Sequence, residues 1–98
     1  MPKLTEQQKR HLRALGHKLK PVVMISGDGF SPPVREELEL QLLHHELLKV
    51  RVSIGERTQR DTLIEEMCTA VGAVLIQRIG NIALLYRSNP DKPRLKLA

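Results

Sequence analysis

Segments with helical periodicity alternate with segments typical of β-strands along this chain of 98 residues. The clearest strand covers residues 47–54, in which apolar and polar side chains alternate. Leu48, Val50, Val52 and Ile54 fall on one side, and Lys49, Arg51 and Ser53 fall on the other. Because successive side chains of a strand point to opposite faces, the pattern predicts one buried face and one basic, less buried face.

A first helix is predicted over residues 6–16. Thr5 and Gln8 form a capping-box pattern at its start, and Gly16 is a typical helix end. Five bases and no acid occur between residues 7 and 27, and those within the helix fall on its outer side. We therefore expect a surface helix with a positively charged face.

Two further helices follow, each with its own start and end signals. The signals are Ser31 before Pro32 for a helix that runs to about His45, and Thr58 with Asp61 for a helix that Gly72 ends. Apolar residues recur at helical spacing in both segments. Each helix is therefore expected to pack one face against the strands.

Three more strands complete the predicted sheet. The apolar run 21–25 is expected to be buried on both faces. Residues 73–87 are expected to form two strands joined by Gly80 and Asn81, a two-residue hairpin signal. The prediction is a single α/β domain in the order α-β-α-β-α-β-β, with three helices on a four-stranded mixed sheet. Its core spans about residues 4–88, and residues 89–98 are expected to form a mobile basic tail.

Charge is unevenly distributed along the chain. The net charge is +5, but acids are concentrated between residues 28 and 76, so both ends are basic. If the two ends meet in space, they form one positive field that attracts phosphate backbones or anionic lipid. The alternative is that these bases only solvate ordinary outer faces.

Several classes of protein are not favoured by the residue pattern. No apolar run reaches the roughly 18 residues of a membrane helix. The basic start continues directly into the first strand without a linker, which does not favour a transit peptide. We expect a cytoplasmic protein without a membrane partner.

The pattern also predicts no catalytic or metal site. His44 and His45 are adjacent and point about 100° apart on a helix, so they cannot share a metal ion as residues four apart would. The lone Cys68 is expected to pack as a small core residue. The adjacent carboxylates Glu36/Glu37 and Glu65/Glu66 are interpreted as solvated helix faces. We expect no enzyme activity, no metal, no cofactor and no small-molecule substrate.

The stretch SGDG, residues 26–29, joins a predicted strand to a helix start. Such a loop collects free backbone N–H groups, and glycines let a phosphate approach without a Cβ in the way. The same residues also form a plain turn, and Asp28 repels an anion unless its side chain caps a local N–H. Both interpretations are open from the residues alone.

Four stretches of the chain together resemble a known family. They are LTEQQKRHLRALGHKLKPVV, GDGFSPPV, HHELLKVRV and RIGNIALLYR, and they reach from residue 4 to about residue 88. The combination resembles the CRM domain (chloroplast RNA splicing and ribosome maturation) in its free-standing bacterial YhbY-type form. The resemblance implies a fold similar to the C-terminal domain of bacterial translation initiation factor three. It also implies RNA binding, with association to precursors of large-subunit ribosomal RNA in ribosomal particles.

The hallmark of the family is a GxxG loop between the first strand and the second helix. The four positions here look like SGDG, so serine replaces the first glycine. The resemblance implies that this loop holds a phosphate while basic side chains neutralise others. The expected RNA-binding residues are Lys9, Arg10, Arg13, Lys18, Lys20, Ser26, Gly27, Asp28, Gly29, Lys49, Arg51, Arg78 and Arg87.

Aromatic residues are too few for a base-stacking platform, because the chain has one Phe and one Tyr. Phe30 is interpreted as an apolar anchor at a helix start, and Tyr86 as a strand residue near the sheet edge. We expect a monomer that recognises RNA by its backbone and shape. The alternatives are a module that docks on ribosomal or other acidic proteins, and a DNA-binding module, for which the sequence offers no recognition helix.

Overall fold

The predicted alternation of helices and strands is present in the computed structural model, which describes residues 4–27 and 29–89. The elements are α1 (Glu6–Gly16), β1 (Pro21–Ile25), α2 (Pro32–His44), β2 (Leu47–Val52), α3 (Arg57–Val71), β3 (Val74–Ile79) and β4 (Ile82–Tyr86). The order α-β-α-β-α-β-β and the four-stranded mixed sheet confirm the predicted fold class.

The four strands lie in the order β1-β2-β4-β3. β1 and β2 are parallel, whereas β4 is antiparallel to both β2 and β3 and lies between them. Gly80 and Asn81 form the predicted turn between β3 and β4, and Gly80 adopts the left-handed conformation that such turns favour (φ +58°). β4, the last strand among the described residues, is therefore inserted into the sheet rather than added at its edge.

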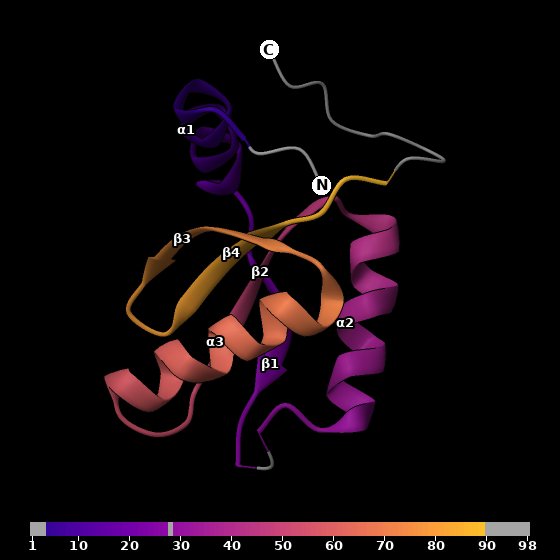
Figure 1. Cartoon of the computed structure of the whole chain (residues 1–98), viewed down its shortest axis with the longest axis vertical. Helices are drawn as coiled ribbons and strands as arrows, with labels where there is room; N and C mark the ends of the chain where they lie inside the picture. The colour runs from indigo at the N-terminus through magenta and orange to yellow at the C-terminus, as the bar shows by residue number, and fades with distance from the viewer. Residues whose placement is uncertain (1–3, 28, 90–98) are drawn as a thin grey trace.

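Helices cover the two faces of the sheet unequally, and α1 lies apart from α2 and α3 (Figure 1). α2 and α3 pack on one face and form the main core with residues of β1, β2 and β4. On the other face a smaller cluster consists of Leu12, Leu47, Ile76, Leu84 and Tyr86. No described residue of β1 belongs to this cluster. α1 therefore covers only part of this face of the sheet.

β1 is buried on one face only, and the prediction of a strand buried on both faces is wrong. Val23 and Ile25 face the main core, whereas Val22 and Met24 are 42% and 63% exposed. A continuous apolar run is typical of a strand covered on both sides. Here β1 is an edge strand, and α1 packs over the other three strands instead.

Gly16 brings α1 close to the sheet. A Cβ added at this position would lie 2.6 Å from Cδ2 of Leu84, which is too close for unstrained packing. Leu12, one turn earlier on α1, is fully buried in the smaller cluster. The contact strip of α1 is therefore narrow, and the remaining sides of the helix are free to carry polar residues.

The predicted start of α1 is confirmed, but the predicted start of α3 is wrong. The capping box of α1 is complete, since the N–H of Gln8 donates to Oγ1 of Thr5 and the N–H of Thr5 donates to Oε1 of Gln8. The N-cap residue of α3 is Glu56, two residues before the expected cap, because a Glu-x-x-Gln pair takes the same role. The N–H of Glu56 donates to Oε1 of Gln59 at 3.0 Å, and Thr58 lies within the helix.

The other predicted helix ends are confirmed in position. Ser31 is the N-cap residue of α2, although its side chain makes no capping hydrogen bond, and α2 ends at His44. Gly72 ends α3 in the left-handed conformation, with a φ of +68°.

The C-terminal segment is bound to the domain as far as the structure describes it. The N–H of Asn89 donates to Oε2 of Glu46 at 2.6 Å, and the N–H of Arg87 donates to the carbonyl of Glu46 at 2.9 Å. Glu46 is 2% exposed. The part of the predicted tail beyond residue 89 lies outside the described residues. Within the described ranges, no helix has both the length and the apolar character needed to cross a membrane.

Candidate nucleic-acid interface

α1 presents basic side chains on the sides that do not contact the sheet. Lys9 and Arg13 are four residues apart and half-buried, and Arg10 is exposed. Lys9 lies 3.7 Å from Glu6, whose side chain is 82% exposed. An exposed pair of this kind is worth about 0–1 kcal/mol, so a phosphate can replace the carboxylate at little cost. The exposed Lys18 and Lys20 continue the basic run into the connection to β1.

A row of side chains crosses all four strands on the part of the face that α1 leaves open. Strand pairing aligns Met24 with Arg51, Arg51 with Ile82, and Ile82 with Ile79. Paired residues of neighbouring strands project to the same face. Met24 and Ile79 are 63% and 64% exposed, and Arg51 is exposed between the apolar residues. We call this set the open row.

A groove of about 190 Å³ lies between the end of α1 and the sheet. It is lined by Gly16, His17, Lys49, Gln77, Ile79, Ile82 and Leu84. Lys49 lies two residues before Arg51 on β2, and His17 follows directly after α1. The groove therefore connects the basic end of α1 to the open row, and its described lining contains no acidic side chain.

The predicted site residues on α1, on the connection to β1 and on β2 thus lie around one side of the sheet. With His17, which the sequence did not single out for binding, they form what we call the basic surface. It consists of Lys9, Arg10, Arg13, His17, Lys18, Lys20, Lys49 and Arg51. The groove and the open row lie within it.

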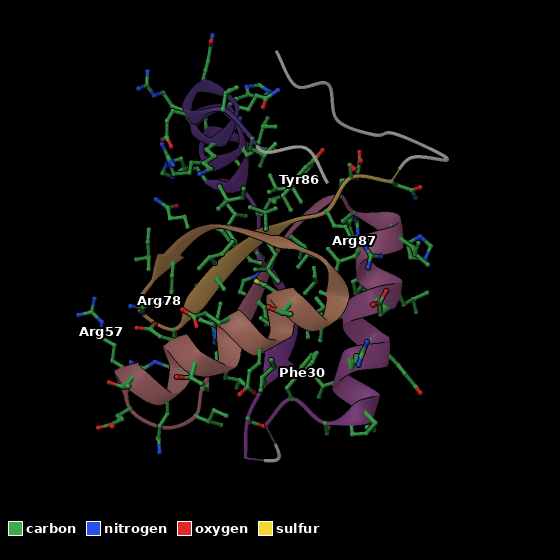
Figure 2. The ribbon with its side chains drawn as sticks, viewed as in Figure 1. Phe30, Arg57, Arg78, Tyr86 and Arg87 are labelled. Atoms are coloured by element: carbon green, nitrogen blue, oxygen red, sulfur yellow. The ribbon has the colours of Figure 1, made fainter. Side chains whose placement is uncertain are left out.

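Arg78 and Arg87 bind acidic residues of the other layer. Nε of Arg78 is 2.7 Å from Oδ1 of Asp61 on α3, and Nη1 of Arg87 is 2.8 Å from Oε2 of Glu39 on α2. Both side chains lie on the side of α2 and α3 (Figure 2) and are only 16% and 18% exposed. The two arginines therefore do not extend the basic surface, and the two basic ends of the chain do not form one field within the described residues. The bases of residues 92–96 lie outside that range.

The SGDG loop forms a turn that uses one of its own donors. The N–H of Gly29 donates to the carbonyl of Ser26 at 2.7 Å, and Gly29 has a φ of +68°. Pro32 and Pro33 then occupy the first two positions of α2, where neither supplies an N–H. These positions normally offer free donors to an anion, so the helix start is poorer in donors than the predicted phosphate cradle requires.

The loop nevertheless leaves space for a ligand to approach. Ser26 and Gly27 are exposed, and no atom lies within 4 Å of the place where a Cβ of Gly27 would stand. The loop directly follows Met24 and Ile25, so it adjoins the open row at the end of β1 away from α1 (Figure 1). Asp28, the remaining predicted loop residue, lies outside the described residues.

Neither aromatic residue is available for base stacking. Phe30 packs against the main core, which confirms its interpretation as an apolar anchor. Tyr86 is 4% exposed and belongs to β4, an inner strand, so its predicted place near the sheet edge is wrong. Burial, together with the negative charge of Glu46, raises the pKa of the Tyr86 hydroxyl. Figure 2 shows both aromatic residues within the fold.

Titratable residues form no reactive cluster in the described part of the chain. Burial raises the pKa of the Cys68 thiol to about 11, which keeps it protonated at neutral pH, and its side chain packs against the main core as predicted. No group of three His, Cys, Asp or Glu side chains that could hold a metal ion occurs among residues 4–27 and 29–89. The chemistry of the basic surface is therefore that of charge, hydrogen bonding and apolar contact.

Known proteins resemble this chain in sequence and in fold. A family model described as the CRS1/YhbY (CRM) domain matches residues 4–87. The chain belongs to this family. A Pseudomonas aeruginosa protein named a probable RNA-binding protein is 42% identical over 97% of this chain and 90% of its own length. A Haemophilus influenzae protein named an RNA-binding protein is 38% identical over 93% of this chain and 92% of its own length.

A solved structure has the same fold as this CRM domain. It is the solution structure of a hypothetical protein from Staphylococcus aureus, described there as a candidate RNA-binding protein. The TM-score is 0.83 with 29% sequence identity, and the match covers 98% of this chain and all of the other. The family predicted from the sequence stretches is thereby confirmed.

Sequence reasoning missed the apolar part of the candidate interface. From the sequence, ordinary strand residues are all that can be inferred for Met24, Ile79 and Ile82. The residue pattern does not determine which face of the sheet α1 covers. A signal was available for the glycine loop, since two consecutive prolines at a helix start remove two of its free N–H groups. The exposure of the open row depends on strand order and helix docking, which the residue pattern does not contain.

Proposed function

We propose that this CRM-domain protein binds structured RNA through the basic surface and acts as a binding protein rather than an enzyme. The observation that carries the proposal is that α1 and β2 both bring Lys and Arg side chains to one side of the sheet, where Lys49 lines a groove with no acidic lining among the described residues. Membership of the CRM family and the names of the relatives support RNA as the ligand.

The proposed mechanism is recognition of the RNA backbone. Lys9, Arg13 and Lys18 neutralise phosphates along α1, while Lys49 and Arg51 bind phosphates that cross the sheet. The SGDG loop contributes space for the backbone at the far end of the open row. Without an exposed aromatic platform in the described chain, selectivity comes from the shape of the RNA.

We further propose that the RNA is a precursor of large-subunit ribosomal RNA, bound in ribosomal particles in the cytoplasm by a monomer. The experiment that tests this is ultraviolet crosslinking in cells followed by sequencing of the recovered RNA. Wild type is compared with a folded Lys9→Ala/Arg13→Ala variant. Peaks on large-subunit ribosomal RNA that disappear in the variant are expected. Peaks that persist unchanged would contradict the basic surface, and particle association that survives RNase treatment would support docking on protein.

Replacing Arg13 by alanine is expected to weaken binding of different structured RNAs to a similar degree. A phosphate contact carries no sequence information, so its loss lowers affinity without changing the order of preference. The slope of log Kd against log salt concentration is expected to fall by about 1. Titrations of two unrelated hairpins at several salt concentrations measure both quantities. A loss confined to one hairpin would show instead that Arg13 reads a specific feature.

A further inference from the structure

We propose that the groove between α1 and the sheet holds one unpaired nucleotide, with its base over Ile79 and Ile82 and its phosphate between Lys49 and His17. This inference rests on the proposed RNA-binding function and deepens it. It assigns the protein a preference for RNA with a bulged or looped-out nucleotide over RNA that is fully paired.

The floor of the groove is apolar and open to solvent. Ile79 and Ile82 face each other across the β3 to β4 turn, and Ile79 is 64% exposed. Removing exposed apolar surface from water is favourable, so an apolar ligand surface that covers Ile79 gains free energy at this position. The flat face of a nucleobase provides such a surface, and contact with aliphatic side chains does not depend on which base is present.

The rim of the groove matches the polar parts of a nucleotide. Lys49 of β2 and His17, which follows α1, both line it, and Arg51 adjoins Ile82 in the open row. Lys49 attracts a phosphate, the imidazole of His17 can hydrogen-bond to it, and the planar guanidinium of Arg51 can stack on an exposed base. Gln77 also lines the groove, and its amide can donate to and accept from the edge of a base.

Size favours one nucleotide over a base pair. The groove of about 190 Å³ is smaller than the roughly 300–1,000 Å³ of pockets for drug-sized ligands. In an A-form duplex the bases are stacked and the major groove is too deep and narrow for side chains to read. An unpaired base can leave the stack and enter the groove. A second copy of this chain docked by the same surface is a poorer occupant, because it would place Lys49 and Arg51 opposite like charges.

The test compares two RNA hairpins with the same stem, one with a single bulged uridine and one fully paired. Kd is measured by fluorescence anisotropy at fixed salt for wild type, Ile79→Ser and Leu43→Ser. Leu43 is a matched control because it is 51% exposed on α2, in the opposite layer. Wild type and Leu43→Ser are expected to bind the bulged hairpin about five- to tenfold more tightly. Ile79→Ser is expected to lose this preference while its affinity for the paired hairpin stays the same.

Two results would overturn the inference while leaving the proposed function intact. One is equal affinity of wild type for both hairpins, and the other is an equal loss of affinity for both hairpins in Ile79→Ser. If wild type binds neither hairpin, the proposed function fails and the inference fails with it. As an independent readout, 4-thiouridine at the bulge is expected to crosslink to residues 74–84, and crosslinks confined to α2 or α3 would contradict the placement.

Discussion

The double variant Arg13→Glu/Lys49→Glu is expected to bind structured RNA about 100-fold more weakly than wild type. Arg13 lies on α1 one turn before His17, and Lys49 lines the groove from β2. Each substitution removes a positive charge that binds an RNA phosphate and places a negatively charged carboxylate next to the phosphate backbone. Close like charges cost several kcal/mol, and a tenfold change in Kd corresponds to about 1.4 kcal/mol, so two reversals are sufficient for this loss.

The matched control is Arg35→Glu/Arg57→Glu, which changes the net charge by the same amount. Both residues are exposed and lie on α2 and α3, in the opposite layer from α1. Nη2 of Arg35 donates to the carbonyl of Ala70 at 3.0 Å, so folding of both double variants is checked by circular dichroism. We expect the RNA affinity of the control variant to fall by less than about fivefold, because salt screens charges that lie far from the bound RNA. Equal losses in both variants would show that RNA responds to net charge alone.

Local residue patterns predict the helices and strands, because side-chain alternation, capping residues and turn glycines act over only a few residues. The alternation in residues 47–54 correctly gives the buried face of β2, since Leu48, Val50 and Val52 lie in the main core. The residue type alone identifies Gly80 as part of a turn and Gly72 as a helix end. The structure shows the reason, since each adopts a positive φ that glycine tolerates at little cost. The start of α3 was misplaced because a Glu-x-x-Gln pair, rather than Thr58, forms the capping arrangement.

The composition of the site could be predicted only in part, because it depends on contacts between distant residues. Arg78 and Arg87 belong to a basic end of the chain, but the fold places them beside Asp61 and Glu39. Arg87 and Glu39 are 48 positions apart, and nothing local marks them as partners. In contrast, the helix and strand patterns place Lys9, Arg13 and Lys49 on the less buried sides of their own elements, although they do not specify that α1 and Lys49 share one face of the sheet. The sequence therefore predicted the cations of the basic surface but not its groove.

Replacing Leu12 by alanine is expected to release α1 from the sheet. Leu12 is 0% exposed and is the buried side chain of α1 in the smaller cluster. Removing a buried leucine costs about 2–5 kcal/mol, which in a domain of this size lowers the Tm by roughly 8–40 °C. The main core contains no residue of α1. We therefore expect the loss of stability to appear first as faster hydrogen exchange of the α1 amides, while the α3 amides remain protected.

RNA affinity separates this effect from a general loss of stability. Leu38→Ala is the matched control, because Leu38 is also 0% exposed but belongs to the main core. Its destabilisation is expected to accelerate exchange in all elements and to leave RNA affinity unchanged at temperatures where the variant is folded. Leu12→Ala is expected to lower affinity under the same conditions, since Lys9 and Arg13 lose the positions on the sheet that the docking of α1 gives them. Equal exchange of α1 and α3 amides in Leu12→Ala would show that both faces of the sheet unfold as one cooperative unit, and unchanged affinity would show that RNA does not need α1 docked.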